Sequence, residues 1–262
     1  MVVMPRIILM GTMFEIDYSN KLFLQSKNPA NKIHFNEMVN YNGSLYALDY
    51  DLKGKTSIKD DLFDGEGVGL FIPKKVLDPK NNQNGIFPSW INKASYEKDW
   101  GILVVDDIIQ HRLDGNLPQI SIKETNYNID ILRGELTPIN NEYSPLSIRK
   151  MGIDKDNFSF CFDPKSKKML GMEVLFRAFE EGFLLADLPG LEAMDPVGFA
   201  KSLGLEETAF LLRTPINMQH HALTEPYTIT KHKEQLNMLV THSKRTRKEP
   251  GIRSRKKSNR IS

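Results

Sequence analysis

The chain lacks the features that mark secreted, membrane-spanning and disulfide-rich proteins. It has one cysteine, Cys161, in 262 residues, so it forms no internal disulfide and fits a reducing compartment. No apolar run approaches the roughly 20 residues that a membrane-spanning helix needs. The apolar stretch 1–10 is interrupted by Pro5 and Arg6, and no small-residue cleavage site follows it, so a signal peptide is not predicted. These absences predict a cytoplasmic protein with no membrane partner.

The balanced overall charge conceals a strong asymmetry along the chain. The net charge is +2, but residues 231–262 carry eleven Lys or Arg residues against two acids. This segment therefore contributes +9, and the rest of the chain carries −7. Such a distribution predicts an acidic globular body with a separate basic arm.

One pattern of residues occurs twice in this body, 113 positions apart, as the pair Pro5 and Pro118 shows. The two copies keep their register without a gap as far as Met38 and Met151. The matched segments are 5–9 and 118–122, 12–17 and 125–130, 46–51 and 158–163, and 72–79 and 188–196. A repeat of this length indicates two structural units of similar fold, and functional differences are expected where the copies differ.

Each copy alternates apolar and polar residues over short segments, which favours β-strands. The fold class we predict is α+β, a tandem duplication of a small β-rich unit with short helices, followed by a C-terminal helix and a disordered basic tail. The predicted organisation is residues 1–88 for the first repeat, 89–116 for a linker element, 117–225 for the second repeat, 226–242 for the C-terminal helix and 243–262 for the tail. Within the linker, the apolar stretch 102–109 fits a strand or a strand entering a helix. We also expect a helix over 206–212.

Two Asp-Pro pairs predict helix starts, because Asp accepts from free backbone N–H groups and Pro needs no donor at the first helical position. Asp195 and Pro196 begin a helix over 197–203 that Gly204 ends. Asp78 and Pro79 have the same signal, but the residues after them offer no apolar face, so this helix is expected to be short or lost.

Candidate catalytic and metal-binding residues are few, and each has a simpler structural interpretation. Residues 65–69 (GEGVG) have the third glycine one position too early for a dinucleotide-binding loop, and a strand follows, so a turn is favoured. Cys161 lies between Phe160 and Phe162 and is interpreted as structural, although it matches Asp49 of the first copy and the two could share an outward-facing site.

The histidines and the repeated acids are interpreted in the same way. His220 and His221 are adjacent on a predicted strand and point to opposite faces, so they do not form a metal site together. Acids recur at matched positions of the two copies, which is typical of turn or cap formers more than of a catalytic pair. These acids are Asp17, Asp49, Asp51, Asp130 and Asp163. No catalytic residue, metal or cofactor is predicted.

The basic tail is the one segment whose composition points to a partner. Clustered cations displace counterions from phosphates, which gives salt-sensitive attraction to DNA or RNA without sequence preference. No aromatic residue separates the clusters, so base stacking is not predicted. The predicted nucleic-acid contacts are Lys244, Arg245, Arg247, Lys248, Arg253, Arg255, Lys256, Lys257 and Arg260. The alternative is a solvated extension without a dedicated partner.

The residues 112–120 (RLDGNLPQI), the strand pair that continues through Tyr127–Asp130, and the endings 188–189 (LP) and 195–200 (DPVGFA) resemble those of uncharacterised duplicated proteins of Bacteroidota. The resemblance covers residues 5 to about 225 and excludes the basic tail. It implies a duplicated α+β fold and implies no activity, ligand or catalytic residue.

Three functions remain open from the sequence. The leading hypothesis is a non-enzymatic binding or adaptor protein that associates with nucleic acid through its tail. The second is a protein–protein interaction module that uses sheet edges of the repeats. The third, ranked last, is an enzyme with a cleft between the repeats, lined by acids such as Asp49 or Asp163. The sequence leaves the oligomeric state open.

Overall fold

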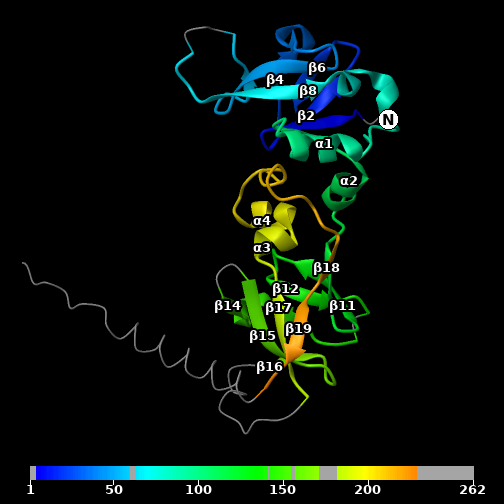
Figure 1. The fold of residues 1–262 in the computed structure, drawn as a ribbon, viewed down its shortest axis with the longest axis vertical. Helices are drawn as coiled ribbons and strands as arrows, with labels where there is room; N and C mark the ends of the chain where they lie inside the picture. Colours follow the sequence, from blue (N-terminus) through cyan, green and yellow to red (C-terminus); the bar gives the residue numbers. More distant parts are fainter. Residues whose placement is uncertain (1–3, 60–62, 141, 155–156, 171–181, 229–262) are drawn as a thin grey trace, which may run out of the picture.

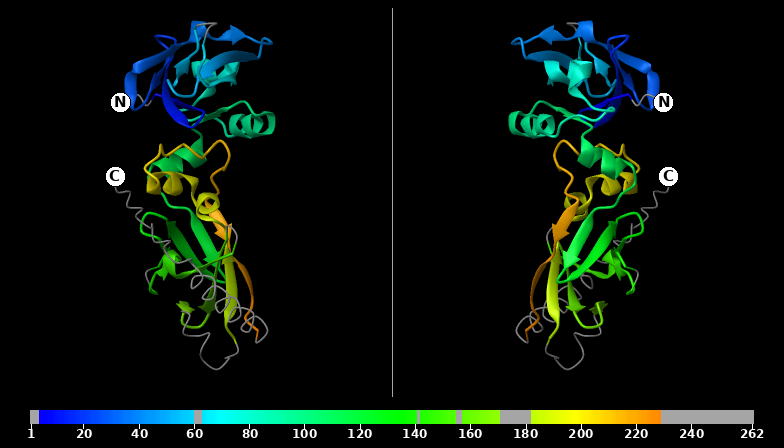
Figure 2. Two further views of the ribbon diagram at one scale, coloured as in Figure 1. Left: turned by 90° about the vertical axis from the view of Figure 1, so that its left-hand side faces the viewer. Right: turned by 90° about the vertical axis from the view of Figure 1, so that its right-hand side faces the viewer.

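The computed structural model describes residues 4–59, 63–140, 142–154, 157–170 and 182–228. Within these ranges the protein is mixed α+β, with four small sheets distributed over two β-rich halves. The halves lie at opposite ends of an elongated molecule, and short helices lie between them (Figure 1). The side views show the same order of half, helices and half along the long axis (Figure 2).

The first half packs two sheets around one core. One sheet has the order β4-β3-β2-β1-β9, and in the other β6 pairs with β5, β7 and β8. The strands are β1 (Arg6–Leu9), β2 (Thr12–Asp17), β3 (Leu22–Gln25), β4 (Asn28–His34), β5 (Val39–Asn40), β6 (Leu45–Asp51), β7 (Thr56–Ser57), β8 (Gly67–Pro73) and β9 (Ile102–Val104). Short 3-10 helices cover Phe35–Glu37, Lys74–Leu77 and Pro79–Asn81. Alternate side chains of both sheets, such as Phe14 and Tyr50, are fully buried between them.

The second half repeats this arrangement. Its first sheet has the order β13-β12-β11-β10-β18, and its second has the order β14-β15-β17-β19 with β16 also on β15. The strands are β10 (Gln119–Ile122), β11 (Thr125–Asp130), β12 (Glu135–Pro138), β13 (Leu146–Ser147), β14 (Gly152–Asp154), β15 (Asn157–Asp163), β16 (Lys168–Leu170), β17 (Leu184–Leu188), β18 (Gln219–His221) and β19 (Leu223–Pro226). A 3-10 helix (Ile148–Lys150) and the one-turn helix α3 (Leu191–Met194) complete it.

The strand register confirms that the halves are similar. Ile7 pairs with Phe14 in β1 and β2, and the residues 113 positions later pair in the same way in β10 and β11. In the second sheets, Asp49 pairs with Gly69, and Cys161 pairs with Leu185. Strand β8 therefore corresponds to β17, and Gly69 occupies the position of Leu185.

The halves differ in the chain segment that follows the edge of each first sheet. Strand β9 runs antiparallel to β1, whereas β18 runs parallel to β10. The two segments occupy the same place in the strand order but run in opposite directions. As a result, the chain next to β9 and the chain next to β18 meet the second sheet of their halves in different ways, as described below.

The helix after the Asp195-Pro196 pair begins where the sequence predicts, but its start is stabilised differently, and the helix over 90–98 was not predicted. Helix α2 (Asp107–Leu113) starts after Asp106, whose Oδ1 accepts from the Ile109 N–H at 3.0 Å. The linker is thus helix α1 (Trp90–Lys98), strand β9 and helix α2. Helix α4 (Pro196–Ser202) also begins at its Asp-Pro pair, but Asp195 makes no side-chain cap and binds Arg112 of α2 instead.

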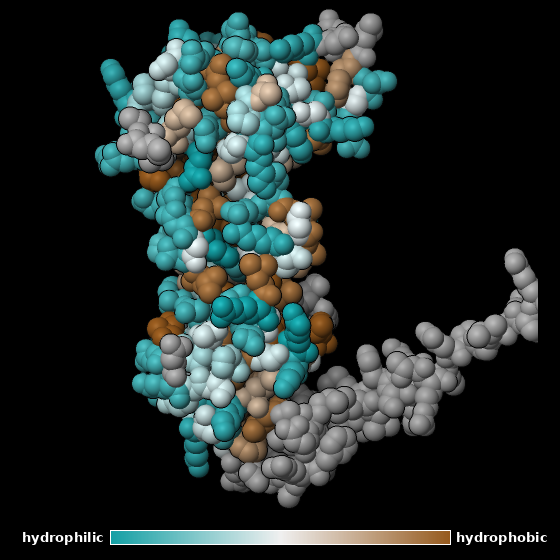
Figure 3. All heavy atoms as spheres, turned by 180° about the vertical axis from the view of Figure 1, so that it is seen from behind, coloured by the Kyte–Doolittle hydropathy of each residue, from teal (hydrophilic) through white to brown (hydrophobic). Residues whose placement is uncertain are grey.

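A small apolar cluster joins the two halves. It combines β1 and β9 with α2, α4 and the segment after α4, through the buried side chains Ile8, Leu103, Val105, Ile109, Val197 and Leu211. The segment after α4 also reaches Gly11 in the tight turn between β1 and β2, because Thr208 Oγ1 donates to the Gly11 carbonyl at 2.6 Å. The halves are therefore packed against each other through the connecting elements. Apolar side chains are visible at this waist from behind (Figure 3).

One further expectation, the helix over 206–212, is corrected. Residues 207–212 form turns and no helix, and backbone hydrogen bonds here join residues three apart, from Ala209 to Glu206 and from Leu211 to Thr208. The helix after the Asp78-Pro79 pair is short, as expected: it is a three-residue 3-10 helix, with the Asp78 carboxylate accepting from the Lys80 N–H at 3.0 Å. The predicted C-terminal helix and tail lie almost entirely outside the described residues, beyond Thr228.

Candidate functional site

The structure separates the sequence-predicted site residues into those it explains and those it does not describe. All nine predicted nucleic-acid contacts, from Lys244 to Arg260, lie outside the described residues, so that prediction stays a prediction. None of the helices within the described ranges is long and apolar enough to cross a bilayer. In the same ranges, no cluster of His, Cys, Asp and Glu side chains is arranged to hold a metal ion.

Four of the five repeated acids form turns, as interpreted from the sequence, whereas Asp49 lies within β6. Asp17 accepts from the backbone and side chain of Asn20 at 2.9 and 2.8 Å, and these hydrogen bonds lower the pKa of its carboxyl. Its counterpart Asp130 accepts from the Arg133 N–H at 3.0 Å. Asp163 accepts from Ser166 and from the Lys165 N–H, which likewise lowers its pKa. These carboxylates are held in turns at separate places.

Cys161 and His220 are both buried. Burial raises the pKa of the Cys161 thiol to about 11, although a hydrogen bond with Tyr227 acts in the opposite direction. Burial lowers the pKa of His220, whose Nε2 lies 2.9 Å from the Met194 carbonyl oxygen. His221, by contrast, is exposed on the opposite face of β18. Cys161 and Asp49 do not share an outward-facing site, because Cys161 is covered while Asp49 is exposed.

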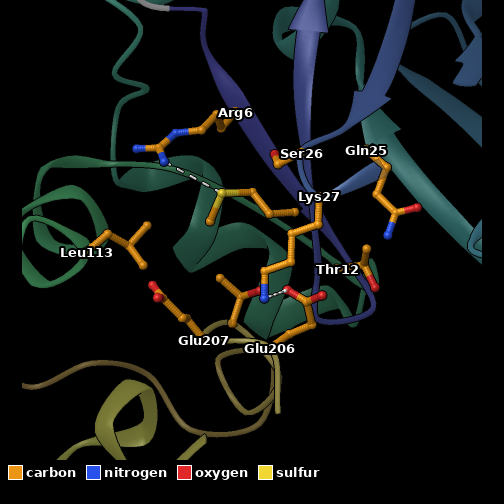
Figure 4. A pocket seen from close by; sticks show the side chains of 10 residues that line it. Arg6, Thr12, Gln25, Ser26, Lys27, Leu113, Glu206 and Glu207 are labelled. Atoms are coloured by element: carbon orange, nitrogen blue, oxygen red, sulfur yellow. Dashed lines mark hydrogen bonds and ion pairs between the residues drawn. The ribbon is translucent and has the colours of Figure 1, made fainter. Parts of the chain in front are cut away.

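A cavity of about 210 Å³ lies at the junction of the halves (Figure 4). Its walls come from β1, β2, the β3–β4 turn and the segment after α4, and Lys27 Nζ pairs with Glu206 across it at 3.0 Å. Arg6 donates to Gln110 on one side, and Glu207 pairs with Lys201 at 3.1 Å. Neither Asp49 nor Asp163 lines this cavity. Its charged groups are satisfied by protein partners, so it does not present a set of groups directed at a ligand.

The outer edge of strand β8 differs from the outer edge of its counterpart β17 in the second half. In the second half, β19 covers the edge of β17 as an antiparallel strand, with Leu185 opposite Glu225 and Asp187 opposite Leu223. The Tyr227 N–H extends this ladder by donating to the Phe183 carbonyl at 2.9 Å. The backbone groups of β17 that point away from β15 therefore have hydrogen-bond partners.

In the first half, the segment that corresponds to the covering strand β19 makes one backbone hydrogen bond with the edge of β8 and goes no further along it. The Phe71 N–H donates to the Trp100 carbonyl at 3.0 Å, at the position that Asp187 occupies in β17. The chain before Trp100 then turns away into α1 instead of continuing along β8. In the described part of the protein, β8 pairs with β6 alone, and Gly67 and Gly69 are exposed. Because backbone direction alternates along a strand, the N–H and C=O groups of these glycines point outward, as those of Phe71 do.

The missing side chain of Gly69 leaves a depression on the outward face of this edge. A Cβ atom built on Gly69 meets no atom within 4 Å. On one side of it, the Phe71 ring packs against Tyr41 with ring centroids 5.0 Å apart. On the other side, Ile58 and Phe63 lie over Gly67, where a Cβ would come within 2.6 Å of the Ile58 methyl group. We call this depression the Gly69 slot.

An acid closes the inner end of the Gly69 slot. Asp49 is directly opposite Gly69 on β6, so its side chain projects from the same face, and it is exposed. No ion pair or side-chain hydrogen bond of Asp49 is found among the described residues. Asp51 follows it on β6, and Asp64 and Glu66 precede β8 and are exposed. The edge is thus bordered by carboxylates.

Sequence reasoning assigned the glycines of 65–69 to a turn that leads into a strand at Leu70, but Gly67 and Gly69 already lie within β8, and the open edge was not identified. The signal was available in the alignment of the two copies, where Gly67 and Gly69 stand opposite Phe183 and Leu185. Comparisons of the chain with protein-family models, with curated proteins and with solved structures found no match.

Proposed function

We propose that the protein is a non-enzymatic adaptor, built by tandem duplication, whose first half captures an extended segment of a protein partner by strand addition at β8. The observation that carries this proposal is the contrast between the two halves. The edge of β17 is covered by β19, and the equivalent groups of β8 have no strand partner among the described residues. An added strand satisfies such groups with main-chain hydrogen bonds, which is a common mode of peptide recognition.

The termination of β19 supports this interpretation. Proteins protect sheet edges with proline, charges or covering segments, because an open edge recruits other strands. Pro226 lies in β19 opposite Leu184, and it alternates with Glu225 and Tyr227, whose backbone groups face β17. The position that lacks an N–H therefore faces outward, where it discourages a further strand. Strand β8 has glycines at its open positions and no proline until Pro73 at its end.

A peptide titration tests strand addition. The probes are hexapeptides Thr-X-Val-Tyr-Thr-Val with Lys, Gln or Glu at X; they copy residues 224–228 with valine in place of Pro226 and one added valine. We expect at least one probe to shift the amide resonances of Gly67 and Gly69 in 15N-labelled protein and to slow their hydrogen exchange. Failure of all three probes to do so contradicts the proposal.

A matched pair of variants locates the binding. Gly69→Pro removes an outward N–H and its ring blocks the edge, whereas Gly69→Ala keeps the N–H and places its Cβ in open space. Binding should persist in Gly69→Ala and disappear in Gly69→Pro, with unchanged circular dichroism in both. Equal binding to both variants places the peptide elsewhere.

The second candidate function is association with DNA or RNA through the tail, and the charge asymmetry favours it. Residues 231–262 carry eleven cations against two acids, and such a segment binds phosphates in a salt-dependent manner. The full chain and a chain that ends before Ser243 should be compared for binding to mixed DNA and RNA over a salt series. Tail-dependent binding that weakens steeply with salt supports this function, and equal binding by both chains contradicts it.

A further inference from the structure

The chemistry around the β8 edge specifies what kind of strand fits it. We infer that the captured segment is basic, with a lysine or arginine in the Gly69 slot and its cation directed at Asp49. This inference rests on the proposed strand addition and adds the class of partner to it.

The first step concerns register. In the second half, Leu185 separates Cys161 on one side from Glu225 of the covering strand on the other. An added strand in the first half places one residue opposite Gly69 in the same way, with its side chain on the face of Asp49. The residue is then two strand spacings, roughly 10 Å, from Asp49 between Cα atoms. Gly69 has no side chain in between, so a long side chain can lie across it.

The second step concerns the shape of the slot. Its walls are the Phe71–Tyr41 pair and the Ile58–Phe63 pair, and Tyr41 is 62% exposed. Lys and Arg combine an apolar stem with a charged end, and such side chains lie along apolar surface while the charge stays in water. Aromatic faces also attract cations. The stem therefore fits between the aromatic walls and the charged end reaches the carboxylate.

The third step concerns charge. Asp49, Asp51, Asp64 and Glu66 border the edge. Lys53 and Lys55 lie in the turn beyond Asp51 and make no ion pair with Asp49 in the described structure, and Lys59, which follows Ile58, pairs with Glu37 at 2.8 Å. The same carboxylates oppose the pairing of β8 with β8 of a second copy, because that arrangement brings two acidic borders together. A basic segment of another protein is the occupant that these charges favour.

The experiment compares the three probe peptides on the wild-type protein. Replacing Lys by Gln at X should raise the dissociation constant by about 1.4- to fivefold, the range for a solvent-accessible ion pair. Glu should bind more weakly than Gln, and the advantage of Lys should shrink as the ionic strength rises.

Variants of Asp49 assign the preference to this residue. Asp49→Asn should bind the Lys and Gln peptides equally, and Asp49→Lys should prefer the Glu peptide. Glu142→Gln, which removes one exposed acid from the second half, should leave the order of the three peptides unchanged.

The outcomes separate the two proposals. If all three peptides bind wild-type protein with equal affinity at the β8 edge, strand addition stands and the basic partner is wrong. If the Lys preference survives in Asp49→Asn, the slot assignment is wrong. If the amides of Gly67 and Gly69 respond to protein concentration without peptide, and sedimentation shows dimers, a second copy occupies the edge. Absence of binding by any peptide overturns the proposed function itself.

Discussion

The ion pair between Arg112 and Asp195 is the interaction whose loss should most weaken the junction of the two halves. Arg112 Nε and Nη2 donate to the two oxygens of Asp195 at 2.9 and 2.7 Å, and the side chains are 4% and 0% exposed. The pair connects α2 with the start of α4. It is closely enclosed, because a Cβ on Gly198 would lie 2.2 Å from an Asp195 oxygen.

Asp195→Asn keeps the shape of the side chain and removes its charge. One carboxylate oxygen becomes an NH2 group that faces a guanidinium donor, and Arg112 stays charged with no room to reach water. Removing one partner of a buried pair costs about 3–5 kcal/mol, most of it from the uncompensated charge that remains. For a protein of this size, 1 kcal/mol corresponds to about 2–4 °C in Tm. We therefore expect a decrease of roughly 10 °C.

Thermal and urea unfolding followed by circular dichroism measure this effect. The matched control is Glu192→Gln, because Glu192 binds Arg213 in the same two-pronged geometry, at 2.8 and 2.6 Å, but at the surface. Exposed pairs contribute little, so the control should change Tm much less. The double variant Arg112→Met/Asp195→Ala should recover part of the loss of Asp195→Asn, because it leaves no buried charge. A decrease for Asp195→Asn no larger than that of the control would refute this reasoning.

Two further predictions follow from single residues. Gly11 has φ of +81° and a Cβ there would lie 3.1 Å from the Ala209 Cα, whereas Gly43 has φ of +80° with nothing within 4 Å; Gly11→Ala should therefore lower the free energy of unfolding by about 1–2 kcal/mol more than Gly43→Ala. Equal losses in urea unfolding would show that the contact is not tight. His220 has a folded-state pKa below its ordinary value of 6.5 because it is buried, so the unfolded chain binds the extra proton and stability is lost as the pH falls below about 6.5. His220→Gln should flatten this part of the stability–pH curve, and an unchanged slope would exclude His220 as its source.

The features that the sequence predicts well are local or repeated. Strands β2 and β11 alternate buried and partly exposed residues along their length, so their period of two residues can be recognised in the sequence alone. The Asp-Pro pair before α4 and the Asp106 cap before α2 are likewise local signals. Because the sequence repeats, a strand predicted in one copy also predicts the matching strand in the other. This is why two similar halves could be predicted from one sequence.

The strands that sequence reasoning missed carry weak patterns. Strand β4 buries only Ile33, and β13 has two residues, so neither shows an alternation. The role of Asp195 was also misassigned, because its partner Arg112 is 83 residues away in the chain and a helix cap is the local alternative. The open edge of β8 depends on the opposite directions of β9 and β18, and chain direction at a sheet edge is a property of the tertiary structure.

The equivalence of the β8 and β17 edges can be tested from the covered side. Cys161 lies under Tyr227, which packs against it together with Leu185, and burial raises the pKa of the thiol from 9.0 to about 11. This shift alone lowers the thiolate fraction at pH 8 about a hundredfold, so Cys161 should react very slowly with a disulfide reagent.

Tyr227→Ala removes this cover and should increase the reaction rate of Cys161 by at least tenfold, without unfolding the second half. Tyr143→Ala provides the control, because Tyr143 is an exposed tyrosine of the same half. A rate that stays low in Tyr227→Ala would mean that the segment after β18 does not shield this edge. In that case the exposure of Asp49 in the first half could not be attributed to the missing cover, and the contrast between the two edges would lose its explanation.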